Sequence, residues 1–293
     1  MKLLAPEFVA KLSNMELKAR TIVEGFIVGL HKSPYHGFSV EFSEYRPYIA
    51  GDPIKEIDWR AYGRTDKLYI KKHEEETNLR SYIVLDKSAS MGFTTTGITK
   101  LEYASCLAGA LAYLMIKQKD AVGLMLFDRD VVDYLPPSAT KVRLFELLAR
   151  LENLSAGGET SIRLPLDKLS ESVRRRSLVI VISDLFDEPE ETISSIKRIH
   201  FAKSELIVFH ILDPAEKTFN YREEAIFEDL ETGRRIQTQP WVLRGDYQKK
   251  VREFADKIRY ELRDAMIDYI PIDTSTPFEL SLMAYLYKRS KLL

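Results

Sequence analysis

The stretch Ser81-Tyr-Ile-Val-Leu-Asp86-Lys-Ser-Ala-Ser90 decides how this sequence is interpreted. Its first five residues form a short apolar run that predicts a buried strand. Asp86 then lies where the strand ends and a loop begins. Asp86, Ser88 and Ser90 alternate along the chain, so an extended or looped backbone can direct three oxygens at one point. A carboxylate and two hydroxyls are hard ligands of the kind that Mg²⁺, Mn²⁺ or Ca²⁺ prefers.

Two later stretches add oxygen donors to this site. Gly157-Gly-Glu-Thr160 is a small polar loop that ends in a hydroxyl, and the apolar run Ser177–Ser183 predicts a second buried strand that leads into Asp184. A helix predicted from about Lys100 gives the order strand, oxygen-rich loop, helix, which is typical of a ligand site at the carboxyl edge of an α/β sheet. The alternative for the first loop is a turn held by local side-chain hydrogen bonds.

Strand and helix patterns alternate through the rest of the chain, which predicts a doubly wound, mostly parallel α/β sheet with right-handed crossovers. We expect six strands between about residues 80 and 275. Further strands are predicted at 121–127, 131–135, 206–212 and 269–272, and helices at 101–117, 142–151, 164–173, 190–201, 243–262 and 277–286. Residues 225–230 and 234–238 flank Thr232-Gly233, a hairpin signal. The main domain is assigned to residues 79–293.

Residues 1–78 are interpreted as an N-terminal extension packed on the main domain. Residues 7–30 show helical periodicity, and residues 37–48 alternate as in a strand or hairpin. Between residue 48 and the first core strand lies a segment rich in charges around Trp59, in which Asp52 and Asp58 lie near Arg46, Arg60 and Arg64 in the sequence. We favour ion pairs that pin a loop beneath Trp59 over a catalytic role for this segment.

Composition limits the function classes. The 293 residues are 45% hydrophobic and 30% charged with a net charge of −1, so no overall charge favours nucleic acid or an anionic membrane. The lone Cys106 excludes an internal disulfide and is expected to be buried and inert. The apolar run 103–116 is too short to span a bilayer, and the N-terminus shows no signal-peptide core, so cytoplasm is the expected location. There is no Walker A, GxGxxG or HExxH string.

The motif Asp86-x-Ser88-x-Ser90, together with Thr160 and Asp184, resembles the metal-ion-dependent adhesion site of von Willebrand factor A domains. The resemblance implies a Mg²⁺ at the carboxyl edge of a doubly wound sheet, with a partner's carboxylate completing the shell. Haloacid dehalogenase phosphatases also place an Asp after their first strand. They resemble this sequence less, because Ser88 stands where that family has a second Asp.

A second resemblance covers nearly the whole chain. It rests on short motifs placed along the sequence: Gly51-Asp52, Ile57-Asp58-Trp59, Arg64, Leu68-Tyr-x-Lys71, the DxSxS strand, Asp229-Leu-Glu-Thr-Gly233 and residues 280–289. With these motifs the chain resembles domain-of-unknown-function family 58 (DUF58). This resemblance implies a von Willebrand A-like domain with an N-terminal extension. It also implies association with a MoxR-type AAA+ ATPase.

Two functional hypotheses follow. The first is a non-enzymatic, Mg²⁺-dependent binding module, an adaptor or chaperone-like partner of such an ATPase, in which the bound protein presents an acidic side chain. The second is a Mg²⁺-dependent hydrolase of a phosphate ester, which would need a positioned general base and a cationic phosphate clamp. No catalytic constellation is visible, so we expect a protein partner. From the net charge we expect no nucleic acid, and from the length of the apolar runs no membrane span.

Overall fold

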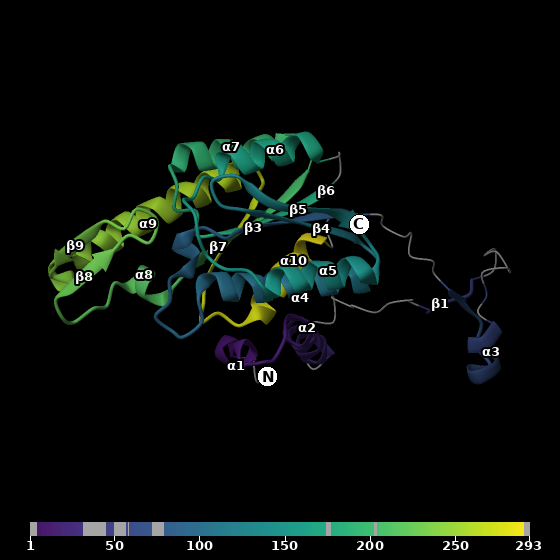
Figure 1. Cartoon of the computed structure of the whole chain (residues 1–293). Helices are drawn as coiled ribbons and strands as arrows, with labels where there is room; N and C mark the ends of the chain where they lie inside the picture. The colour runs from purple at the N-terminus through teal and green to yellow at the C-terminus, as the bar shows by residue number, and fades with distance from the viewer. Residues whose placement is uncertain are drawn as a thin grey trace.

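The computed structural model describes residues 5–31, 45–49, 57, 59–71, 79–173, 177–201 and 204–289. Its centre is a six-stranded sheet in the order β10-β7-β6-β3-β4-β5 (Figure 1), which confirms the predicted α/β class. All neighbouring pairs are parallel except β4 and β5. The strands are β3 (Arg80–Asp86), β4 (Ala121–Phe127), β5 (Val131–Ser138), β6 (Ser177–Ser183), β7 (Glu205–Leu212) and β10 (Asp268–Asp273).

Alternating side chains of each central strand enter two separate cores. In β3, Ile83 and Leu85 join the core on one face, while Tyr82 and Val84 join the core on the other. Because both faces are covered, β3 and β6 read as continuous apolar runs instead of alternating patterns. These uninterrupted apolar runs are why both strands could be predicted from the sequence.

Helices cover both faces of the sheet (Figure 1). The helices α6 (Arg163–Ser172), α7 (Pro189–Phe201) and α9 (Pro240–Asp264) supply one core. The other core contains α4 (Lys100–Lys117), α5 (Lys141–Glu152) and α10 (Phe278–Arg289). As predicted, α4 is buried nearly all round, and it contains the buried Cys106, where burial raises the thiol pKa to about 12. Among the described residues, no helix is long and apolar enough to cross a membrane.

Two N-terminal helices form a further layer outside α4. The predicted single helix over residues 7–30 is divided into α1 (Pro6–Ala10) and α2 (Met15–His31). Gly109 of α4 lies where α2 and α5 meet α4: a Cβ there would be in ordinary contact with Met15 Sδ of α2, at 3.5 Å, and in tight contact with Leu148 Cδ2 of α5, at 3.2 Å. Part of the N-terminal extension therefore packs on the main domain.

The rest of the described N-terminal segment forms β1 (Tyr45–Pro47), α3 (Trp59–Thr65) and β2 (Tyr69–Lys71), and β1 pairs with β2 in antiparallel fashion. The predicted strand at 37–48 lies mostly outside the described residues, as do Asp52 and Asp58. Trp59 is 59% exposed and meets Tyr62 edge to face, so its ring covers little of the chain. The ion-pair interpretation and the boundary at residue 78 stay predictions.

One predicted strand end is wrong. Pro136-Pro137 was expected to end the strand after Leu135, yet β5 continues to Ser138. β5 is an edge strand, and its pairing with β4 shifts register between the Val122 and Leu124 pairs. At an edge next to a bulge, prolines cost the ladder few hydrogen bonds.

Candidate metal site at the carboxyl edge

β3 and β6 end side by side at the centre of the sheet. The chain runs from β3 to β4 on one side and later returns to β6 on the other, so the direction of winding changes between β3 and β6. Ligands of open α/β sheets bind outside such a switch point. Asp86 is the last residue of β3, Ser183 the last of β6, and Asp184 follows. Ser183 Oγ donates to Asp86 Oδ2 at 2.6 Å, which ties the two strand ends together.

The two predicted serines follow Asp86 in a tight turn. After Ser88 the chain forms one turn of 3₁₀ helix, Ala89–Gly92, and Ser88 N donates to Asp86 Oδ1 at 2.9 Å. The hydroxyl oxygens of Ser88 and Ser90 lie 3.1 Å apart. Two adjacent oxygens of an octahedral Mg²⁺, each about 2.1 Å from the ion, lie about 3.0 Å apart. The spacing of the two hydroxyls therefore suits adjacent ligands of such an ion.

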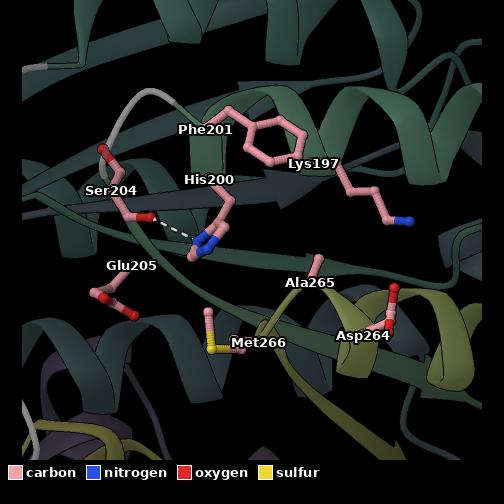
Figure 2. A pocket seen from close by; sticks show the side chains of 8 residues that line it. All are labelled: Lys197, His200, Phe201, Ser204, Glu205, Asp264, Ala265 and Met266. Atoms are coloured by element: carbon pink, nitrogen blue, oxygen red, sulfur yellow. Dashed lines mark hydrogen bonds between the residues drawn. The ribbon is translucent and has the colours of Figure 1, made fainter.

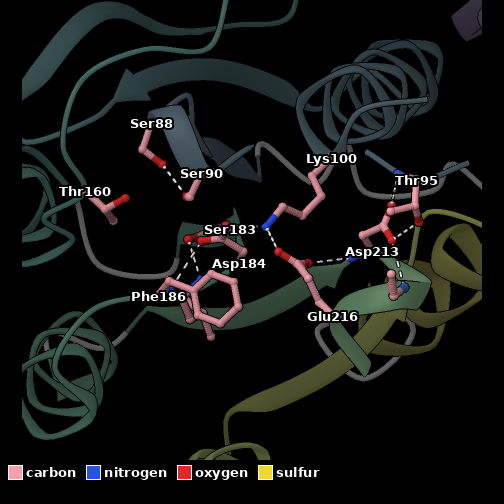
Figure 3. A network of polar contacts seen from close by, with 12 residues as sticks. Ser88, Ser90, Thr95, Lys100, Thr160, Ser183, Asp184, Phe186, Asp213 and Glu216 are labelled. Carbon is pink, nitrogen blue, oxygen red and sulfur yellow. Dashed lines mark hydrogen bonds and ion pairs between the residues drawn. The ribbon is translucent and has the colours of Figure 1, made fainter. Parts of the chain in front are cut away.

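The loop that carries Thr160 is bound to the same turn. Ala89 N donates to Gly158 O, and Gly157 N donates to Lys87 O, each at 2.9 Å. Gly158 has φ +87°, and a Cβ there would lie 2.7 Å from Asp128 Oδ2, so a side chain at this position would push the loop away. Figure 3 shows Thr160 on the same side of the network as the Ser88–Ser90 pair.

Asp184 is held by a lysine that the sequence interpretation missed. Lys100 Nζ lies 2.7 Å from Asp184 Oδ2 and 2.7 Å from Glu216 Oε1, and the Lys100 side chain is fully buried (Figure 3). The other Asp184 oxygen accepts a longer bond, 3.3 Å, from Phe186 N. One signal for Lys100 was available: it begins an apolar helix, where the helix dipole disfavours a cation. Such a cation needs carboxylate partners.

Glu216 belongs to a second tight turn. Asp213 caps the short helix α8 (Pro214–Thr218) and forms a capping box with Glu216, whose Oε2 accepts from Asp213 N at 2.7 Å. Asp213 also accepts from Thr95 N at 2.8 Å. These bonds connect the loop after β3 to the loop after β7, and Lys100 joins both to Asp184.

The electrostatics show a site with too little positive charge. Burial first, and then the nearby charge of Asp184, raise the pKa of Asp86 to about 7, against the hydrogen bonds from Ser183 and Ser88, which lower it. Burial lowers the pKa of Lys100, but Asp184 and Glu216 outweigh this and hold it above its usual 10.5. Burial also raises the pKa of Glu216. Lys100 thus pairs with two carboxylates, those of Asp184 and Glu216, while Asp86 accepts hydrogen bonds from Ser88 N and Ser183 Oγ. A divalent cation would relieve the repulsion between Asp86 and Asp184.

The residues fit a hard divalent cation, and the chemistry of the donor set is the reason. Among the described residues, no three His, Cys, Asp or Glu side chains gather as a metal cage. The candidate site consists instead of three hydroxyls and two carboxylates, a set suited to Mg²⁺ and unsuited to zinc. Asp86, Ser88 and Asp184 are buried, whereas Ser90 and Thr160 are partly exposed, so the five donors extend from the buried strand ends to the surface.

Glu231 also reaches this site. Thr160 Oγ1 donates to Glu231 Oε1 at 2.5 Å, and Thr160 N donates to Glu231 Oε2 at 3.0 Å. Sequence reasoning placed Glu231 only in a hairpin, because nothing local relates it to Thr160, 71 residues earlier.

A hollow of the surface lies elsewhere (Figure 2). It has a volume of about 530 Å³ and is formed by the end of α7, the start of β7 and the turn after α9. His200 Nδ1 lies 3.1 Å from Ser204 O in its wall. Since Glu205 starts β7, this hollow is at the amino edge of the sheet, opposite the candidate metal site. It contains none of the predicted donors.

The fold and the site together define an α/β protein with a doubly wound sheet and an oxygen-rich ligand site at its switch point. The chain belongs to the family described as protein of unknown function DUF58, whose model matches residues 44–257. This confirms the family expected from the Asp86 motif and the segment around Trp59.

Two proteins of known sequence and two solved structures are among those similar to this chain. The uncharacterised proteins Mb1516 of Mycobacterium bovis and Rv1480 of Mycobacterium tuberculosis are each 24% identical over 231 residues, 78% of this chain and 72% of theirs. The crystal structure of the hypothetical protein BatB from Bacteroides thetaiotaomicron has a TM-score of 0.49 at 19% identity, over 73% of this chain and 98% of that one. The SpRpn10 VWA domain has a TM-score of 0.42 at 13% identity, over 73% and 96%.

Proposed function

We propose that this chain is a Mg²⁺-dependent protein-binding module. Asp86, Ser88, Ser90, Thr160 and Asp184 would hold the ion, and Mn²⁺ or Ca²⁺ would suit the same oxygens. The ion would supply a Lewis-acidic position that binds and orients a partner's carboxylate. The observation that supports this best is the Ser88–Ser90 hydroxyl pair, 3.1 Å apart, next to the buried Asp86, whose carboxylate accepts from the neutral donors Ser88 N and Ser183 Oγ.

The partner would be a protein that presents an exposed Glu or Asp, and a MoxR-type AAA+ ATPase is the candidate through the family resemblance. Contacts around the ion would supply most of the affinity, and the ion would fix the orientation. Ser90 and Thr160, the two partly exposed donors, mark the side from which a carboxylate would approach.

The alternative, a phosphate-ester hydrolase, needs a cationic clamp within reach of the substrate. Lys100 is the cation next to Asp184, but its side chain is fully buried and bound to two carboxylates. It is not available to a phosphate group, so no observation favours this second function.

The test is a Mg²⁺ titration by calorimetry, followed by interferometry against a MoxR-type ATPase from the same source. We expect Mg²⁺ binding in the unmodified chain and none in Ser88→Ala/Ser90→Ala, with ATPase binding that needs Mg²⁺. Ser155→Ala/Ser172→Ala is the matched control, because both serines are exposed and outside the site. Equal binding of the ATPase in EDTA would place the interface elsewhere, for example around Trp59.

A further inference from the structure

The tip of the β8–β9 hairpin is built to present one carboxylate. β8 (Ala225–Glu228) and β9 (Arg235–Thr238) are joined by the turn Asp229-Leu-Glu-Thr-Gly233. Asp229 Oδ1 accepts from Glu231 N at 2.9 Å, its Oδ2 accepts from Thr232 Oγ1 at 2.5 Å, and Gly233 N donates to Asp229 O at 2.8 Å. Gly233 has φ +70°, a conformation that glycine adopts without strain. The turn is therefore ordered from within, and only the backbone N of Glu231, not its carboxylate, takes part in these bonds.

Burial singles out Glu231 within this hairpin tip. Every residue from Glu228 to Gln237 is exposed except Glu231, which is partly buried. The cause is its contact with Thr160, in which each carboxylate oxygen accepts one hydrogen bond, from Oγ1 and from the backbone N. An otherwise solvated hairpin thus makes a specific two-point contact with a predicted metal ligand.

The charge of Glu231 is not balanced by a basic side chain. In the described part of the chain, no lysine or arginine lies in ion-pair distance of its carboxylate, whereas Glu228 in the same hairpin pairs with Arg235 at 2.9 Å. Glu231 instead places a carboxylate on Thr160, while Lys100 is already paired with both Asp184 and Glu216. Carboxylates gathered around neutral hydroxyls in this way call for a cation.

We propose that Glu231 is the chain's own carboxylate donor to the metal site, so that the hairpin tip covers the site in the free protein. This inference rests on the proposed function, because it needs the ion at Ser88, Ser90 and Thr160. It goes beyond the five predicted ligands by adding a sixth oxygen donor from a distant element. A partner's carboxylate would then have to displace Glu231, so opening of the hairpin becomes a step in binding.

The test compares Glu231→Gln with Glu228→Gln. Both variants neutralise one carboxylate of the same hairpin, but only Glu231 contacts Thr160. In calorimetric titration with MgCl₂ alone, we expect Glu231→Gln to lower Mg²⁺ affinity at least tenfold and Glu228→Gln to change it less than twofold. Asp229→Ala should act like Glu231→Gln, because it removes the hydrogen bonds that order the turn.

A second measurement reports directly whether the hairpin tip covers the metal site. Hydrogen exchange of the backbone amides at 230–234 should slow on addition of Mg²⁺ in the unmodified chain and in Glu228→Gln, and should not change in Glu231→Gln. Mg²⁺ binding that is equal in Glu231→Gln and the unmodified chain overturns this inference alone. Absence of Mg²⁺ binding in the unmodified chain overturns the proposed function and the inference with it.

Discussion

Two groups of ion pairs in this molecule have the same chemistry and opposite surroundings. At the carboxyl edge, Lys100 and Asp184 are both fully buried at 2.7 Å. Between α7 and α9, Lys197 meets Glu261 at 2.6 Å, and Lys257 pairs with Glu190, with all four side chains at least partly exposed. Water and salt screen the second group, so each pair contributes little. Burial makes every unpaired charge of the first group expensive, and this cost is one basis of the cation site that we propose at the carboxyl edge.

The largest difference between the two groups should appear on removal of the lysine. Lys100→Met leaves Asp184 and Glu216 buried without their shared cation. Loss of one member of a buried pair costs about 3–5 kcal/mol. Lys257→Met breaks an exposed pair, which is worth about 1 kcal/mol or less.

Urea unfolding of both lysine variants in EDTA at pH 7 measures this contrast. If Lys100→Met is destabilised no more than Lys257→Met, burial of the Lys100 ion pairs has no energetic consequence, and the contrast drawn between the two groups is wrong.

A nearly equal effect, of opposite sign, is expected for Asp86→Asn without metal. The folded pKa of Asp86, about 7, exceeds its usual 3.8, so the unfolded chain releases this proton first. Stability is therefore lost as pH rises from about 3.8 to about 7. Asn cannot ionise and can still accept from Ser88 N, so Asp86→Asn should be more stable at pH 8 in EDTA, by up to about 4 kcal/mol.

Thermal unfolding of Asp86→Asn at pH 8 and pH 4 in EDTA checks this prediction, and the gain should vanish at pH 4. Addition of MgCl₂ should raise the melting temperature of the unmodified chain and leave Asp86→Asn unchanged. A variant that is less stable than the unmodified chain at pH 8 would contradict the charge imbalance inferred for this edge.

The smallest of the three effects concerns His210. This buried residue of β7 pairs with Ser183 at the end of β6. Burial lowers its pKa to about 4, and its Nδ1 lies 2.5 Å from Tyr269 Oη. A depressed histidine pKa means that the unfolded chain takes up the proton first, so stability is lost as pH falls from about 6.5 to about 4. The loss should reach about 3 kcal/mol at pH 4.

His210→Gln removes the titrating group and retains a side chain that can bond Tyr269. Its stability relative to the unmodified chain should improve by about 3 kcal/mol between pH 7 and pH 4, measured by urea unfolding at each pH. Parallel curves over this range would show that His210 does not titrate there.

Several elements could be predicted from local pattern because their cause is local. The apolar runs of β3 and β6 are short and buried on both faces, and a polar residue directly after each run has to lie at the strand end. This is why Asp86 and Asp184 were placed correctly at neighbouring ends of the sheet. The Thr232-Gly233 signal likewise located the β8–β9 hairpin. In contrast, β5 continues through Pro136-Pro137 to Ser138. Prolines are tolerated there because β5 is an edge strand, and only the assembled sheet shows which strand lies at the edge.

The sequence by itself determined the doubly wound class, the strand ends that carry Asp86 and Asp184, and the oxygen-donor chemistry between them, since periodicity and residue type act over a few residues. Only the tertiary structure decided which charges meet there. Lys100 lies 84 residues before Asp184 and 116 before Glu216, and Glu231 lies 71 residues after Thr160. Such contacts depend on how α4, α8 and the hairpin dock on the sheet, and on the burial that turns ordinary charges into costly ones.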